Sequence, residues 1–155
     1  MSTVARRPPL HRRTFVATTA LVVTAGCSAF DHTEPGDFDR GEMDVVVDGD
    51  PVDLSADRFQ AEHADDHSID FHFHEFDDYW YMEGEPVTFA EAVDRIPRFA
   101  FERRDGEFVV TVDGTTYDGG EPGAEFAFFV DGDAVDPTAY EVADGDHLEL
   151  VVTTG

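Results

Sequence analysis

The sequence predicts an α+β domain that is mostly β, with a mixed sheet and one short helix at about residues 88–96 packed across it. From residue 43 onward, short runs rich in Val, Phe and Leu alternate with Gly-containing turns, as in strands joined by hairpins. One segment alone combines a helix cap with the apolar spacing of an amphipathic helix. We therefore expect a single domain over residues 43–155, with an extra hairpin at its N-terminal end.

The first strands are predicted from turn residues and from alternation. Residues 45–54 indicate a strand, a turn at Asp48-Gly49 and a returning strand. Residues 69–74 alternate strictly between apolar and polar side chains, which predicts one buried face and one solvent face. We expect a two-residue turn at Asp77-Asp78, after which residues 79–83 pair with this strand.

The predicted helix has a recognisable beginning and end. Thr88, followed three residues later by Glu91, forms a capping box, and Pro97 ends the helix. Apolar residues at positions i, i+4 and i+7 place one face against the sheet: Phe89, Val93 and Ile96. Further strands are expected at residues 107–112, 124–130 and 147–152.

The order of hairpin, helix and closing strand over residues 69–155 resembles the β-grasp fold of ubiquitin-like sulfur-carrier proteins. The likeness rests on residues 129–132 and on the Asp-Gly-Asp turn that leads into residues 147–152. Those carriers end in Gly-Gly, whereas this chain ends in Thr153-Thr154-Gly155, so carrier chemistry does not follow. The resemblance implies a non-catalytic binding scaffold.

The N-terminal residues have the order of an export signal. Residues 1–14 are basic, and residues 15–25 form an apolar run that is shorter than the roughly 20 residues needed to span a membrane. Arg12, Arg13 and Phe15 resemble the twin-arginine motif, which directs folded proteins across a membrane. We expect residues 1–26 to be removed on export.

The sequence holds a single cysteine, Cys27, directly after the apolar run. Residues 24–27 resemble a lipobox, after which the new N-terminal cysteine carries lipid, and a lone cysteine cannot form an internal disulfide. The alternative is an unmodified thiol. We expect Cys27 to be lipidated, residues 27–42 to form a flexible tether, and the domain to lie at the outer face of the cell membrane.

The chain is strongly acidic, with 35 acidic and 10 basic side chains, a net charge of −25 and no lysine. This charge excludes nucleic acid as a partner. Salt shortens the Debye length from about 10 Å at 0.1 M to about 3 Å at 1 M, so a saline medium relieves the repulsion between acidic groups. With its export motif, the chain resembles the twin-arginine-exported lipoproteins of haloarchaea.

Histidines supply the candidate metal ligands. His72 and His74 share one face of the predicted strand, and a two-residue turn would place Glu83 opposite His72. His63 and His67 are four residues apart and would add ligands if their segment were helical. Imidazole and carboxylate groups suit Zn²⁺ or Cu²⁺. The alternative is that these histidines fill the polar face of an amphipathic strand.

A cluster of arginines follows the predicted helix and contains four of the six basic residues beyond Cys27. It comprises Arg95, Arg98, Arg103 and Arg104. One interpretation is a cationic docking patch for an envelope protein partner. The other is a set of local ion pairs with neighbouring acidic residues, namely Glu102, Asp105 and Glu107.

Catalytic motifs are not found in the sequence. It contains no Gly-x-Ser-x-Gly elbow, phosphate-binding Gly-rich loop or His-Glu-x-x-His helix. We therefore expect a lipid-anchored, salt-adapted, non-catalytic binding or interaction module at the cell surface. The alternative is a surface metal-binding protein that uses the His-x-His strand. A third class, a small hydrolase with its acidic groups among the surface charges, stays open.

Overall fold

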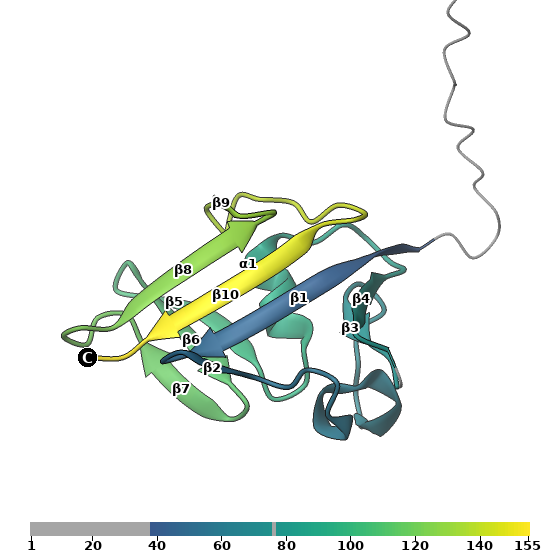
Figure 1. Ribbon diagram of the computed structural model, residues 1–155, viewed down its shortest axis with the longest axis horizontal. Coiled ribbons are helices and arrows are strands. Elements are labelled where there is room, and N and C mark those ends of the chain that lie inside the picture. Colours follow the sequence, from purple (N-terminus) through teal and green to yellow (C-terminus); the bar gives the residue numbers. More distant parts are fainter. Residues whose placement is uncertain (1–37, 76) are drawn as a thin grey trace, which may run out of the picture. The chain divides into compact units, whose positions relative to one another are not determined.

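The computed structural model describes residues 38–155 except residue 76. It confirms a mostly β domain with one short helix (Figure 1). Two 3-10 turns span Asp57–Phe59 and Ala61–His63. The other elements are β1 (Asp39–Val47), β2 (Asp50–Pro51), β3 (His72–Phe73), β4 (Tyr79–Met82), α1 (Phe89–Arg95), β5 (Ala100–Arg104), β6 (Glu107–Val112), β7 (Thr115–Asp118), β8 (Glu125–Val130), β9 (Asp133–Ala134) and β10 (His147–Thr153).

The residues predicted to carry export and lipidation lie outside the described residues: Arg12, Arg13, Phe15 and Cys27. Within the described part of the chain, no helix is long and apolar enough to cross a membrane.

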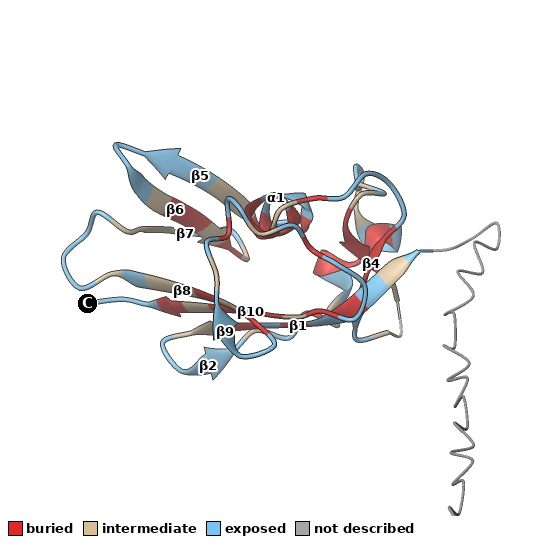
Figure 2. Ribbon diagram, turned by 90° about the horizontal axis from the view of Figure 1, so that it is seen from above, coloured by how far each residue is buried: buried red, intermediate tan, exposed pale blue. Residues whose placement is uncertain are grey.

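The strands form two sheets. A seven-stranded mixed sheet has the order β3-β4-β1-β10-β8-β9, with β2 paired to β1, and β5, β6 and β7 form a separate antiparallel sheet. β1 and β10 run parallel, from the pair Glu42 and His147 to the pair Val47 and Val152. Helix α1 and the three-stranded sheet lie on the same side of the large sheet (Figure 2).

The predicted N-terminal hairpin is present as β1 and β2, but β1 is longer and more central than expected. This strand begins at Asp39, four residues before the expected start of the domain, and it also pairs with β4 and β10, which places it in the centre of the sheet. Its first residues are polar or lack a side chain, so the sequence there has no apolar alternation by which a strand could be recognised. At Gly41 a Cβ atom would clash with the carbonyl oxygen of Asp146 and come within 2.7 Å of the Trp80 ring, so only glycine fits.

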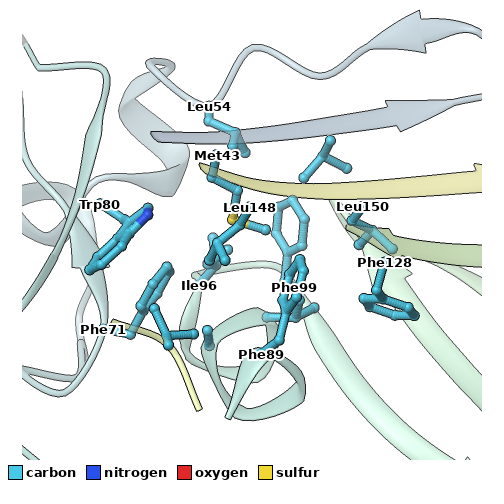
Figure 3. Close-up of a cluster of buried hydrophobic side chains, with 14 of the residues drawn as sticks. Met43, Leu54, Phe71, Trp80, Phe89, Ile96, Phe99, Phe128, Leu148 and Leu150 are labelled. Carbon is cyan, nitrogen blue, oxygen red and sulfur yellow. The ribbon is translucent and has the colours of Figure 1, made fainter. Parts of the chain in front are cut away.

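The hydrophobic core lies between the large sheet and the layer that contains α1 (Figure 3). The predicted capping box is confirmed, since the Thr88 hydroxyl accepts the Glu91 N–H at 3.2 Å and the Glu91 carboxylate accepts the Thr88 N–H at 2.7 Å. From α1 and the turn after it, Phe89, Val93 and Ile96 are each at most 1 % exposed, and they belong to one core cluster with buried leucines of β10. The predicted helix and its buried face are therefore confirmed.

Four hairpins turn through an Asp-Gly pair in which both residues have positive φ, the geometry of a type I′ turn. Asp tolerates this conformation better than most residues because its short side chain bonds locally, and Gly has no Cβ to clash. The predicted turn at Asp48-Gly49 is confirmed, and Asp131-Gly132 joins β8 to β9 in the same way. The other two turns, Asp105-Gly106 and Asp113-Gly114, join the strands of the smaller sheet.

Candidate metal centre

The β3/β4 hairpin positions the candidate ligands, but its register differs from the prediction. His72 pairs with Tyr81 and Phe73 with Trp80, so the predicted pairing of His72 with Glu83 is wrong. The strands are joined by residues 74–78 rather than by a two-residue turn. A shift of two residues keeps His72 and His74 on the same face of the hairpin as Tyr81 and Glu83, because side chains in a strand alternate with period two.

Local hydrogen bonds explain the longer connection. The Asp77 carboxylate accepts the Tyr79 N–H at 3.1 Å, and it also accepts a hydrogen bond from the Tyr81 hydroxyl. The first of these contacts has the pattern of an Asx turn, in which an Asp side chain bonds the backbone two residues on, and both tie Asp77 to β4.

Three of the predicted ligands converge. The two Nε2 atoms of His72 and His74 are 3.0 Å apart, and Glu83 Oε1 lies 3.5 Å from the first and 3.8 Å from the second. The Glu83 backbone is fixed by a 2.9 Å hydrogen bond from its N–H to the carbonyl of Ile69. One ligand atom from each of the three residues lies within 4.8 Å of the other two, so this group could hold a metal ion.

His72 is buried, which corrects its predicted place on a solvent face. The residue is only 3 % exposed, and its ring lies against those of Tyr81 and His74. Burial lowers the pKa of His72, and repulsion from His74 lowers it further, although Glu83 opposes the shift. The neutral imidazole therefore prevails, and a neutral ring keeps a lone pair for a metal ion.

The two ring nitrogens of His74 have different partners. Nε2 faces the other ligands, whereas Nδ1 is 2.6 Å from Glu62 Oε1. Burial raises the pKa of Glu62, but hydrogen bonds from His74, from its own backbone and from Glu75 outweigh burial and leave this pKa below its usual value. Glu62 is a site residue that sequence reasoning missed.

His63 and His67 do not complete the predicted ligand set. The two residues do not share a helix, because His63 ends the 3-10 turn at Ala61–His63 and His67 lies in an irregular segment. His63 Nε2 pairs with Glu75 Oε1 at 2.7 Å. The His67 ring lies 6.2 Å from that of His72, beside the group of three rather than in it.

The predicted arginine cluster, which consists of the last residue of α1 and three residues that follow the helix, lies among acidic groups. Arg98 Nε is 2.6 Å from Asp113, and Arg104 contacts Glu102 at 3.3 Å and Asp118 at 3.6 Å. Arg95 lies 3.9 Å from an Asp70 oxygen, while the Arg103 guanidinium stacks 5.0 Å from the centre of the Phe108 ring. Of the predicted acidic partners, Glu102 is in an ion pair with this cluster. Docking of an envelope protein at these arginines stays a prediction.

Comparison of the chain with family models, with curated proteins and with solved structures finds no match. The functional argument therefore depends on the geometry of His72, His74 and Glu83.

Proposed function

We propose that this domain binds a divalent transition metal ion, Zn²⁺ or Cu²⁺, through His72 Nε2, His74 Nε2 and the Glu83 carboxylate. The convergence of these three ligand atoms is the observation that supports the proposal. In a tetrahedral site with metal–ligand bonds of 2.0–2.1 Å, neighbouring ligand atoms are about 3.3 Å apart. The observed separations of 3.0, 3.5 and 3.8 Å lie on both sides of this value, so an ion needs only small movements of the side chains.

The chemistry of the ligands supports a transition metal over the ions that dominate a saline medium. K⁺ and Mg²⁺ prefer oxygen ligands, and Mg²⁺ keeps much of its hydration shell, whereas two imidazole nitrogens suit Zn²⁺ and Cu²⁺. Burial keeps His72 in the neutral, metal-binding form. A ring with a nearly fixed position also loses little conformational freedom when the ion binds.

We place this site in a lipid-anchored, salt-adapted and non-catalytic module at the outer face of the cell membrane. The twin-arginine motif, Cys27 and the acidic composition support this proposal. The fold supports a β-grasp-like interpretation, because the first and last strands run parallel at the centre of the sheet with α1 packed on one face. A fold alone does not determine function, so support for binding comes from the site residues rather than from this likeness.

A metal titration of the full chain tests the proposal. The chain carries Cys27→Ser, which removes the single thiol, and the buffer contains molar KCl and excess Mg²⁺ to saturate diffuse binding to carboxylates. Isothermal titration with Zn²⁺ and then Cu²⁺ is expected to show one ion bound per chain at micromolar affinity or tighter.

Two variants identify the ligands without disturbing the core. His74→Ala and Glu83→Gln change half-exposed side chains and are each expected to weaken binding at least tenfold. His63→Ala is the matched control, because His63 pairs with Glu75 outside the group of three. If the chain binds several metal ions weakly, and neither variant changes that binding, the proposal of a specific site is contradicted.

A further inference from the structure

We propose that Glu62 is the positioning residue of this centre: it holds His74 with the proton on Nδ1 and the lone pair of Nε2 directed at the metal. This inference rests on the proposed metal-binding function. It assigns a role to one carboxylate among 35 acidic side chains, a role that no motif in the sequence marks.

The proton position follows from hydrogen-bond chemistry. An ionised carboxylate can only accept hydrogen bonds, so the 2.6 Å contact between Glu62 Oε1 and His74 Nδ1 requires the hydrogen on that nitrogen. In a neutral imidazole the other nitrogen then carries the lone pair. For His74 that atom is Nε2, which faces His72 and Glu83.

Glu62 is itself held in place by groups that do not belong to the ligand set. Its second oxygen, Oε2, accepts the backbone N–H of Glu75 at 3.1 Å. A β-bridge between Gln60 and Phe73 joins the segment before Glu62 to β3, and the buried Gln60 amide donates to the carbonyl of Leu54 at 3.0 Å. The two 3-10 turns consequently lie beside the β3/β4 hairpin, where Glu62 can reach His74 (Figure 1).

Charge balance gives Glu62 a second effect on the bound ion. A divalent cation with neutral His72, neutral His74 and ionised Glu83 leaves one positive charge against a buried ring. The Glu62 carboxylate, one imidazole away, neutralises that charge and makes His74 a more basic ligand. A histidine that binds a metal commonly donates its other ring N–H to a carboxylate. Loss of that carboxylate weakens metal binding by about 10–100-fold.

The chain contains a matched pair for comparison. Glu75 contacts His63 at 2.7 Å, much as Glu62 contacts His74, but His63 lies outside the group of three. Glu75→Gln therefore changes the same kind of carboxylate–histidine contact and the same net charge as Glu62→Gln. The Glu62 side chain, which holds His74, is unchanged in the Glu75→Gln variant.

The test is a Zn²⁺ titration of the full Cys27→Ser chain and of its Glu62→Gln and Glu75→Gln forms in molar KCl with excess Mg²⁺. We expect Glu62→Gln to weaken Zn²⁺ binding by about 10–100-fold with the stoichiometry unchanged, and Glu75→Gln to stay within about twofold of the parent. A second measurement uses nitrogen-15 NMR of the metal-free protein. The His74 ring is expected to carry its hydrogen on Nδ1 in the parent and to lose this preference in Glu62→Gln.

Each outcome has a definite meaning. If the parent binds one Zn²⁺ and Glu62→Gln binds equally well, the positioning role is wrong and the metal-binding function stands. A loss of affinity in both variants would assign the effect to net charge and would also overturn the role. If the parent binds no stoichiometric Zn²⁺, the proposed function fails and the inference fails with it.

Discussion

His72 occupies a position that is costly for a metal-free protein. Its side chain is buried, and Nδ1 makes no hydrogen bond of ordinary geometry with any residue that the structure describes; the Ser68 backbone raises the pKa of the ring, but less than any other group that shifts it. An unsatisfied buried polar group destabilises a fold by about 1–3 kcal/mol, so an apolar ring would be the more stable choice there. An imidazole at this position is explained if its other nitrogen, Nε2, binds a metal ion.

Replacement of His72 by phenylalanine separates stability from binding. Phenylalanine keeps an aromatic ring against Tyr81 and removes the unpaired Nδ1, while the half-exposed His74 can replace its lost contact with His72 Nε2 by water. We therefore expect His72→Phe to raise the metal-free unfolding free energy by about 1 kcal/mol. The same variant is expected to lose stoichiometric Zn²⁺ binding. Urea unfolding at high salt measures the first effect, with the half-exposed His74→Phe as control. Destabilisation by His72→Phe would show that the histidine is a structural group.

The sequence points to the group of three candidate ligands but not to the residue that supports it. Five of the seven histidines lie between residues 32 and 74, and His-x-His on a strand places both rings on one face, whereas Glu83 is predicted from a strand pairing that the structure shows to be wrong. Glu62 has no comparable signal, since it is one of many surface acids. Its position depends on the bridge between Gln60 and Phe73, a tertiary contact with no local pattern.

Among the helices and strands, caps and turns can be predicted from the sequence, but the pairing of distant strands cannot. The capping box of α1 and the Asp-Gly turns involve neighbouring residues, so they can be recognised in the sequence. The central position of β1 depends on its parallel pairing with β10, about 100 residues away, and β5 and β7 are short strands without strict alternation. Alternation predicted which side chains of β3 and β4 share a face, but it predicted neither the strand register nor the burial of His72.

Asp48 links the turn after β1 to the end of β10 and makes that link sensitive to pH. Its carboxylate accepts the Thr154 N–H at 2.7 Å and the Thr154 hydroxyl at 2.8 Å, and these hydrogen bonds lower the pKa of Asp48 below 3.8. A folded-state pKa below the unfolded value means that the stabilisation is complete above about pH 4 and is lost as the pH falls through the folded value.

We therefore expect Asp48→Asn to have a lower melting temperature than the parent at pH 7 and a difference that shrinks as the pH falls below about 4 and through the folded-state pKa of Asp48. Asparagine tolerates the positive φ of 50° at this turn, so the variant changes the charge and leaves the backbone conformation accessible. Thermal unfolding from pH 7 to pH 2.5 in molar KCl measures the difference. Asp50→Asn, at an exposed position of β2, is the control, and a pH-independent difference would contradict the expectation.

For the whole molecule, the balance of charge sets the conditions under which the domain is stable. The few basic side chains cannot offset 35 acidic ones, and one carboxylate, that of Asp113, already contacts both Arg58 and Arg98. Most acidic groups therefore face water and one another. Compaction brings these charges together, so folding increases their repulsion unless mobile ions screen it.

Stability is consequently expected to rise with ionic strength. Between 0.1 M and 2 M KCl we expect the unfolding free energy to increase by about 2 kcal/mol or more, which corresponds to a melting temperature about 8 °C higher. Calorimetry in KCl and in NaCl at equal ionic strength measures the effect, and sucrose at matched viscosity controls for osmolyte stabilisation. An unchanged melting temperature would show that the acidic surface does not strain the fold.

The parallel pairing of β1 with β10 also determines when the chain can fold. The centre of the large sheet consists of one strand from the start of the domain and one from its last residues, so Val45 cannot meet its partner Leu150 until synthesis reaches residue 150. Parallel pairs with long sequence separation form slowly because the intervening loop must close first. A nascent chain on the ribosome can form the local hairpins and α1, but the buried core of Figure 3 must wait for translation of residues 147–153.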